Sequence, residues 1–344
     1  MTQIEISASR NYAVTIGSDL LNGLSQTLRK LTKAEKVCIV SDSNVFALYG
    51  QQLCEALTAD RLSVARFVFR PGEEQKNSCT YLRLLECLAQ NGLTRTDCII
   101  ALGGGVVGDL AGFAAATYLR GIPYIQIPTS LLAMVDSSVG GKTGIDLPAG
   151  KNLCGAFYQP AAVICDTDVL STLPEDVFRD GCAEVIKYAV LFDPELFRLL
   201  EQTGLDFDRE AVIARCVEHK RNVVVGDEFD RGQRMLLNLG HTIGHAIETC
   251  SDYTISHGKA VSIGMAMVCS AAKCPDADRI SALLEKFGLP TTTTLPAKAL
   301  WEAALSDKKR SAQMVNLIVP NAIGDCSVVP TAIEKLKTFI EEGI

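Results

Sequence analysis

The sequence predicts two domains, an α/β domain with a parallel sheet and then an all-α domain. Three observations lead to this fold class. Short apolar runs alternate with helical segments through the first half of the chain. A glycine-rich turn stands directly between one such run and a helix. After Pro174, apolar residues recur mostly with a helical period, so we place the domains at 1–173 and 174–344.

The composition is that of an ordinary globular protein large enough for two cores. The 344 residues include 33 Lys and Arg against 40 Asp and Glu, and the net charge of −7 argues against a nucleic-acid binder. We find no signal-peptide pattern and no uninterrupted apolar stretch of membrane-spanning length. The 13 Cys are scattered and odd in number, which favours reduced, buried thiols. We therefore expect a soluble, cytoplasmic protein with no membrane partner.

The elements of the first half alternate in the order expected of a parallel sheet covered on both faces. Ligands of such sheets bind at the carboxyl ends of the strands. The predicted strands are Tyr12–Gly17, Lys36–Ser41, Val64–Phe69, Cys98–Leu102, Tyr124–Ile127 and 161–166, and the predicted helices are Val45–Thr58, Ser78–Asn91 and Val107–Leu119.

A GxGxxG pattern lies within Gly103–Asp109, between a predicted strand and a predicted helix. Glycine lets the backbone approach a pyrophosphate, and the helix N-terminus favours its negative charge, so we predict a dinucleotide site. A simple tight turn is the alternative. The usual acidic residue about 20 positions later is missing. Ser41–Asn44 and Pro71–Lys76, which follow earlier strands, are the alternative sources of a ribose partner.

Residues 128–160 are rich in glycine, hydroxyl groups and lysine. Gly140–Thr143 is similar to part of a P-loop, but Asp136 occupies the position where that motif requires glycine, which excludes it. We expect a long functional loop here, with a solvent-exposed linker as the alternative.

Three of the four histidines lie within Asn238–Gly258. His241 and His245 are four residues apart and so project from one face of a helix, where imidazoles serve as metal ligands or acid–base groups. Spacing therefore suggests these two as a ligand pair. Gly240 and Gly244 each cost a helix about 1 kcal/mol relative to Ala, which we interpret as room for a site. The alternative is a polar helix face.

Basic residues are dispersed along the chain. If they converge on the histidines, the pocket would suit a substrate with phosphate and carboxylate groups. Glu184 and Lys187 share one face of the predicted helix Asp180–Leu191, and a surface salt bridge is the alternative for that pair. The cations are Lys142, Lys151, Lys187, Lys220, Arg234 and one of Lys308 and Lys309.

Several long blocks closely resemble the 3-dehydroquinate synthase family. They are Gly103–Phe113, Ile125–Asp146, Ala183–Tyr188 and Asn238–Ala246, and the resemblance covers nearly the whole chain. It implies a lyase of the shikimate pathway that depends on NAD and a divalent metal, Zn or Co. The substrate implied is 3-deoxy-D-arabino-heptulosonate 7-phosphate, a phosphorylated sugar acid, which becomes 3-dehydroquinate and phosphate. A homodimer with the site between a nucleotide-binding α/β domain and a helical domain is also implied.

The resemblance also implies roles for individual residues. The metal ligands become Glu184, His241 and His257, whereas His245 contacts substrate as an acid–base group. The implied substrate residues are Asp136, Lys142, Asn152, Lys187, Lys220, Arg234, Asn238 and Lys308, with Arg120 reaching across a dimer interface. The implied NAD residues are Asp42, Glu73, Lys76, Gly104, Gly105, Val106, Val107, Gly108, Asp109, Thr129, Ser130, Lys142, Lys151 and Thr172.

Two positions depart from the family pattern. Lys259 and Asp230 stand where glutamate is usual, which puts the charge around the metal in doubt. Three alternatives stay open: another NAD- and metal-dependent sugar phosphate cyclase, a metal-dependent alcohol dehydrogenase of similar fold, and a non-catalytic subunit.

Overall fold

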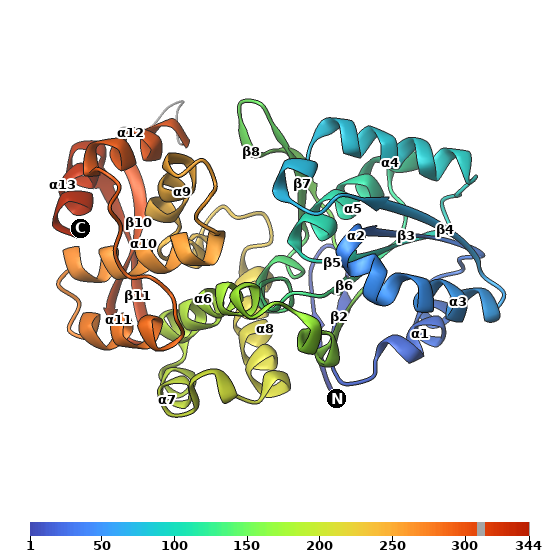
Figure 1. Cartoon of the computed structure of the whole chain (residues 1–344), viewed down its shortest axis with the longest axis horizontal. Coiled ribbons are helices and arrows are strands. Elements are labelled where there is room, and N and C mark those ends of the chain that lie inside the picture. The colour runs from blue at the N-terminus through green and yellow to red at the C-terminus, as the bar shows by residue number, and fades with distance from the viewer. Residues whose placement is uncertain (308–313, 344) are drawn as a thin grey trace. The chain divides into compact units, whose positions relative to one another are not determined.

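The computed structural model describes residues 1–307 and 314–343, which form two compact units (Figure 1). The first unit is Met1–Leu173 with Lys220–Phe229, and the second is Pro174–His219 with the residues from Asp230 onward. The predicted boundary after residue 173 had placed Lys220–Phe229 in the helical domain, whereas the structure groups it with the first unit. Hydrogen bonds explain its membership, because Glu228 accepts one from the Ser9 hydroxyl and one from the Gln159 amide.

The first unit is built on a seven-stranded sheet in the order β1-β2-β9-β6-β5-β3-β4. Only β1 and β2 pair antiparallel, and the other neighbours are parallel. This confirms the predicted α/β fold class, although β1 had not been predicted as a strand. The strands are β1 (Thr2–Ile6), β2 (Tyr12–Gly17), β3 (Lys36–Asp42), β4 (Ser63–Phe69), β5 (Cys98–Gly103), β6 (Tyr124–Pro128) and β9 (Ala162–Asp166).

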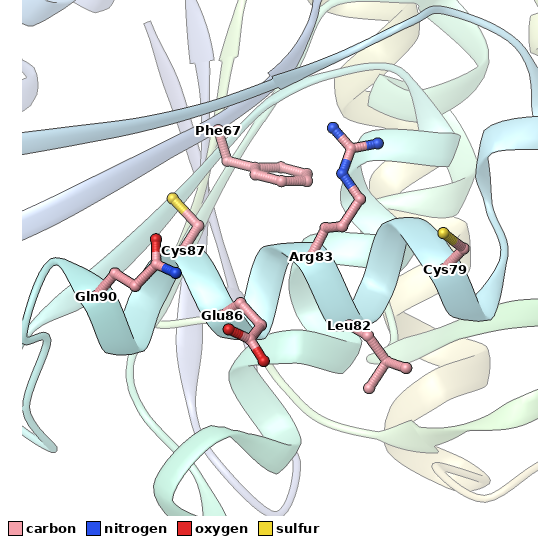
Figure 2. A pocket seen from close by; sticks show the side chains of 7 residues that line it. All are labelled: Phe67, Cys79, Leu82, Arg83, Glu86, Cys87 and Gln90. Atoms are coloured by element: carbon pink, nitrogen blue, oxygen red, sulfur yellow. The ribbon is translucent and has the colours of Figure 1, made fainter.

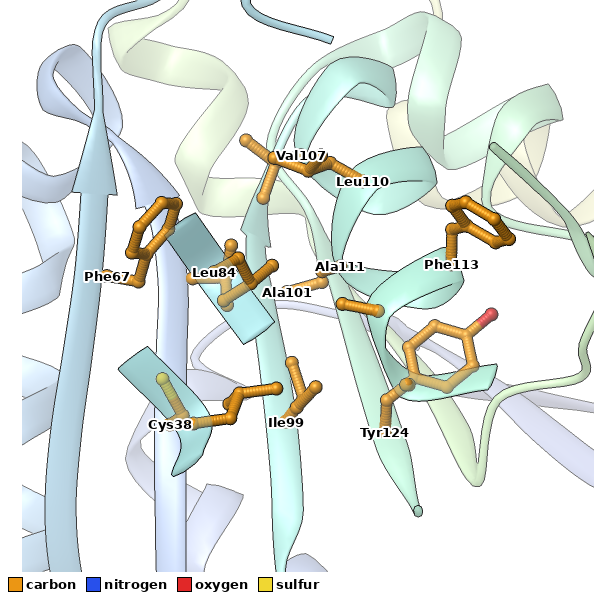
Figure 3. Packing of buried hydrophobic residues seen from close by; sticks show 14 of the residues in the cluster. Cys38, Phe67, Leu84, Ile99, Ala101, Val107, Leu110, Ala111, Phe113 and Tyr124 are labelled. Carbon is orange, nitrogen blue, oxygen red and sulfur yellow. The ribbon is translucent and has the colours of Figure 1, made fainter. Parts of the chain in front are cut away.

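Successive residues of a strand point to opposite faces of this sheet, and each face has its own core. Cys38 of β3 and Ile99 of β5 pack with Leu84 of α4 on one face (Figure 3). Val37 of β3 packs with Leu57 of α3 on the other. Both faces are covered, as parallel sheets require. The helices are α1 (Leu24–Leu31), α2 (Ser43–Val45), the π turn η2 (Phe46–Gly50), α3 (Gln51–Ala59), α4 (Ser78–Gln90) and α5 (Gly105–Thr117).

The prediction of a long loop over residues 128–160 was wrong. The segment contains the π turn η5 (Ala133–Ser137) and an antiparallel hairpin of β7 (Lys142–Leu147) and β8 (Gly150–Phe157). Gly144 and Gly155 face each other in this hairpin, and a Cβ on Gly155 would lie 2.1 Å from the Thr143 carbonyl oxygen. The glycines therefore allow two backbones to approach closely.

The second unit is mainly helical, as predicted, and also contains one hairpin that the prediction of an all-α domain left out. The hairpin's Leu317 is buried with Ile243, Ile263 and Leu336 of three helices, so it helps to complete their core. No helix of residues 1–307 and 314–343 has the length and apolar character needed to cross a membrane. The elements are α6 (Glu175–Phe192), α7 (Pro194–Thr203), α8 (Arg209–Gly226, which continues into the first unit), α9 (His241–Cys250), α10 (His257–Ala271), α11 (Ala277–Lys286), α12 (Ala297–Asp307), β10 (Met314–Ala322), β11 (Asp325–Ala332) and α13 (Ile333–Gly343).

Glycines let helices α9 and α10 pack backbone to backbone. A Cβ on Gly264 would lie 2.1 Å from the Gly240 carbonyl oxygen, and one on Gly244 would lie 3.1 Å from that of Ala260. Gly240 also has a φ of +77°, which favours glycine. Our interpretation of Gly240 and Gly244 as room for a site was therefore wrong, because close helix packing requires them.

Candidate active site

Glu184, His241 and His257 come together from helices α6, α9 and α10 of the second unit. One atom of each residue lies within 4.8 Å of the other two. Nε2 of His241 and Nε2 of His257 are each 3.4 Å from Oε1 of Glu184. Two imidazole nitrogens and one carboxylate, which leave a coordination position for substrate, form a donor set of catalytic zinc.

The surroundings of Glu184 fit a cation. Its side chain is buried, and within the described part of the chain neither carboxylate oxygen has a hydrogen-bond partner. The Lys187 ammonium forms an ion pair with Oε2, and both side chains are only 1% exposed. The alternative of a surface salt bridge for this pair was therefore wrong. A buried carboxylate without hydrogen bonds is costly, and a divalent ion would complete its coordination.

Charge and burial set the protonation of the three residues. Burial opposes ionisation of Glu184, but the Lys187 ammonium and His241 hold the pKa of this carboxyl well below its usual range. Burial and the same ammonium lower the pKa of His241. Burial also disfavours the charged form of His257, but the nearby carboxylates of Glu184 and Glu248 raise the pKa of His257 to about 10. A metal ion would therefore displace a proton from His257.

His245 lies beside this cluster, with its ring centroid 5.5 Å from that of His241 and 6.0 Å from that of His257. It belongs to a second group of potential ligands with Glu248 and His257. The set around Glu184 therefore pairs His241 with His257, whereas spacing had suggested His241 with His245. Glu248 was not predicted as a site residue, although its position seven residues after His241 places it on the same helix face.

The other predicted site residues of the second unit differ in burial. Arg234 is buried in the turn η8 (Gln233–Asn238), and Asn238 is exposed at the end of that turn. Lys187 is buried beside Glu184. Lys308 and Lys309 lie outside the described residues.

The predicted NAD residues of the first unit gather at one edge of the sheet. Carboxyl ends of parallel strands meet at the same edge, and the strand order reverses between β3 and β5, where ligands of such sheets bind. Asp42 ends β3, Glu73 and Lys76 follow β4, Gly104–Asp109 follows β5, Thr129 and Ser130 follow β6, and Thr172 follows β9.

Lys76 is the centre of a polar cluster at this edge. Its buried ammonium lies 2.7 Å from Oε1 of Glu73, 3.3 Å from Oδ2 of Asp109 and 3.7 Å from Oδ1 of Asp146. It donates to Oδ1 of Asn152 over 2.8 Å. Burial raises the pKa of Asp109 to about 6 although Lys76 opposes the shift. The cluster joins predicted residues from distant blocks and adds Asp146, which was not predicted.

The glycines of the GxGxxG pattern have two kinds of surroundings. A Cβ on Gly103 would lie 2.5 Å from Cγ2 of the rigid Val107 side chain, so packing requires that glycine, whereas one on Gly108 would lie 2.7 Å from Oε1 at the end of the Gln126 side chain. Gly104 precedes the first residue of α5, and its absent Cβ would lie 3.5 Å from the Ser130 hydroxyl. No Cβ therefore stands at Gly104 or Gly105, where α5 begins.

Other predicted residues of the first unit lie outside the Lys76 cluster. Lys220 forms an ion pair with Asp136. Lys142 and Lys151 belong to the hairpin β7–β8. Arg120 is exposed and has a left-handed φ of 67°. Since the predicted cations are divided between the two units, their convergence on the histidines stays a prediction.

A hollow of 470 Å³ lies along α4 (Figure 2). None of its lining residues is a predicted site residue. They are Phe67, Cys79, Leu82, Arg83, Glu86, Cys87 and Gln90.

Comparisons with known proteins agree with the sequence resemblance. Residues 66–180 match the model of the 3-dehydroquinate synthase N-terminal domain, and residues 181–310 match that of the C-terminal domain. The chain is 44% identical to 3-dehydroquinate synthase of Pelobacter propionicus, over 98% of this chain and 99% of that one.

Two solved structures are similar over almost their whole length. A 2-deoxy-scyllo-inosose synthase complexed with carbaglucose-6-phosphate, NAD+ and Co2+ is 26% identical with a TM-score of 0.88, over 100% of both chains. The 2-epi-5-epi-valiolone synthase of Streptomyces hygroscopicus, with NAD+ and Zn2+ bound, is 27% identical with a TM-score of 0.88, over 99% of this chain and 98% of that one. The family matches and the full-length similarity together show that this chain belongs to the 3-dehydroquinate synthase family.

Proposed function

We propose that this chain converts 3-deoxy-D-arabino-heptulosonate 7-phosphate to 3-dehydroquinate and phosphate, as a lyase of the shikimate pathway. The family membership supports this reaction. The single structural observation that carries it is the grouping of the buried Glu184 with the partly buried His241 and His257, which suits a divalent metal.

The two cofactors are assigned to separate sets of residues. Glu184, His241 and His257 would hold Zn or Co, and the carboxyl edge of the sheet from Asp42 to Thr172 would hold NAD. The similar structures with NAD+ and Co2+ or Zn2+ support this assignment. The glycines at the N-terminus of α5 support it too, because helix N-termini favour pyrophosphate. Residues 1–173 would then bind NAD, and residues 174–344 would supply the metal site.

The chain's own residues would orient the substrate and move protons. When bound, NAD supplies a reversible hydride acceptor and the metal supplies a Lewis acid. His245, one helical turn after His241, would exchange protons with the substrate. Lys187, Lys220 and Arg234 would bind its anionic groups. The net reaction would release phosphate and close a carbon ring, with no net change in NAD.

Further parts of the proposal concern the cellular context. We place the enzyme in the cytoplasm as a homodimer, with Arg120 reaching the partner subunit. Its substrate is a phosphorylated sugar acid, and we expect the enzyme to bind neither nucleic acid nor membranes.

The test is phosphate release from the heptulosonate phosphate, measured together with NADH absorbance. We expect phosphate without net NADH, loss of activity with a chelator, and recovery with Zn2+ or Co2+. Glu184→Gln should abolish the recovery, whereas the exposed Glu302→Gln should not. Steady NADH accumulation would instead favour an alcohol dehydrogenase. Turnover of another sugar phosphate only would favour a different cyclase.

A further inference from the structure

His257 turns its two ring nitrogens to two different carboxylates. Nε2 lies 3.4 Å from Oε1 of Glu184, and Nδ1 lies 3.3 Å from Oε2 of Glu248. The Glu248 side chain is buried and reaches His257 from the neighbouring helix α9. This arrangement raises the question of which carboxylate binds the metal and which one orients the ring.

We propose that Glu248 is a positioning residue, which holds His257 with Nε2 directed at the metal held by Glu184 and His241. A ligating histidine generally donates its second ring N–H to a carboxylate or carbonyl group, which fixes the tautomer and the ring orientation. Glu248 can accept a hydrogen bond from Nδ1–H, which leaves the Nε2 lone pair for the ion. The inference rests on the metal dependence proposed above.

The second ligand group, His245 with Glu248 and His257, offers the competing assignment. Two ions, one on Nδ1 and one on Nε2 of His257, would need an imidazolate ring, which has no N–H left. Both carboxylate oxygens of Glu184 are buried and, within the described residues, have no hydrogen-bond partner. These facts place the single ion at Glu184 and give Glu248 the orienting role.

His241 is oriented in a comparable way, but by the backbone. Its Nδ1 lies 3.0 Å from the Leu239 carbonyl oxygen, while Nε2 faces Glu184. A side-chain substitution cannot remove that carbonyl. Glu248 is therefore the partner through which the orientation of a ligand ring can be tested by mutation.

Asp180 holds the backbone on the other side of His257. Its carboxylate accepts hydrogen bonds from the Ser256 hydroxyl and from the Lys259 N–H over 3.0 Å. The backbone of His257 is thus anchored from α6, whereas Glu248 sets the rotation of its ring. The carboxylate beside His257 is therefore that of Glu248 on α9. A glutamate at position 259, where this chain has Lys259, is not needed to supply it.

The test is the binding of Co2+ to metal-free protein, measured by competition with a chromogenic chelator. Glu248→Ala should weaken binding about 10- to 100-fold, the usual effect of losing such a partner. Glu248→Gln keeps an oxygen acceptor of nearly the same shape, so its affinity should lie between the wild type and Glu248→Ala. Glu302→Gln removes a carboxylate that is 58% exposed on α12 and should bind like the wild type.

The outcomes separate the possibilities. Glu248→Ala and Glu248→Gln that both bind Co2+ like Glu302→Gln would overturn the proposal. A fall from two bound ions to one in Glu248→Ala would do so too, because Glu248 would then be a ligand. If Glu248→Ala does not fold, Glu248→Gln alone should still bind more weakly than Glu302→Gln. A wild type that binds no Co2+ would contradict the proposed metal dependence itself.

Discussion

Nε2 of His257 lies 3.4 Å from Oε1 of Glu184, although the two residues belong to helices α10 and α6. Helix α10 reaches this position because glycines permit close backbone contacts, at Gly264 with α9 and at Gly258 with α6. The geometry of the candidate metal site is therefore a consequence of helix packing. The first two predictions concern contacts that this packing produces.

The first prediction separates ligands from the acid–base group. His257→Ala and His241→Ala should lose the metal, because each removes a nitrogen that faces Glu184. His245→Ala should keep the metal but turn over about 10²- to 10⁴-fold more slowly, the usual cost of a lost general acid–base group. Metal content after gel filtration and the rate of phosphate release are the measurements. Equal loss of metal in His245→Ala and His257→Ala would contradict these roles.

The second prediction concerns the contact between α6 and α10. A Cβ on Gly258 would lie 2.0 Å from the Asp180 carbonyl oxygen, so Gly258→Ala must push the two helices apart. We expect a loss of about 1–3 kcal/mol in the free energy of unfolding, as for other overpacked sites. Co2+ binding should also weaken, because His257 precedes Gly258. Urea unfolding and the chelator competition assay measure the two effects.

The matched control is Gly23→Ala, since a Cβ there would meet no atom within 4 Å. Its free energy of unfolding should stay within about 0.5 kcal/mol of the wild type. Similar losses for Gly23→Ala and Gly258→Ala would mean that the contact with Asp180 is not the cause.

The strands of the parallel sheet could be predicted from the sequence because their signal is local. A run such as Lys36–Ser41 is short, apolar and rich in β-branched residues, and β3 contains it. The hairpin β7–β8 was missed because its glycines have the composition of a loop. Gly144 and Gly155 are required only once the two strands are paired, which no local pattern reveals.

The candidate site shows the same limit. Helical spacing relates His241 to His245, but it cannot relate either residue to Glu184 on another helix. The resemblance to a family supplied that grouping. Glu248 was missed because a glutamate on a polar helix face is common, and only the position of α10 gives it a histidine partner.

The third prediction is a pH dependence of stability that originates at Asp193. Burial opposes its ionisation, but hydrogen bonds from Arg215, His219 and the Leu196 N–H lower the pKa to about 2. A depressed pKa stabilises the fold above the unfolded value of about 3.9, and the contribution is lost as the pH falls through about 2. Asp193→Asn should therefore be less stable at pH 7, with a difference that shrinks towards pH 3.

The expected difference at pH 7 is about 1 kcal/mol, less than the full shift implies, because Arg215 is 35% exposed and solvent screens the pair. Urea unfolding at pH 7, 5 and 3 measures it. Glu195→Gln is the control, since Glu195 lies 3.7 Å from the same guanidinium but is 76% exposed. A difference between Asp193→Asn and the wild type that stays constant with pH would contradict the assignment.

The fourth prediction concerns Cys87, which lines the hollow along α4 together with Cys79 (Figure 2). A hydrogen bond with Cys38 lowers the pKa of Cys87 to about 7, although burial opposes the shift, and the Asn91 amide donates to the same sulfur over 3.6 Å. Since the thiolate is the reactive form, alkylation of Cys87 by iodoacetamide should reach half its maximal rate near pH 7. Peptide mass spectrometry between pH 6 and 9 measures the rate at each cysteine.

Cys38→Ala removes the hydrogen bond that stabilises the Cys87 thiolate, so the half-maximal rate at Cys87 should move to a higher pH. Cys79 is exposed in the same hollow and serves as an internal control, whose profile should not change in the variant. A Cys87 profile that is the same with and without the Cys38 thiol would show that the shift has another cause. In that case the contact of Cys38 on β3 with Cys87 on α4 would not control how fast Cys87 is alkylated.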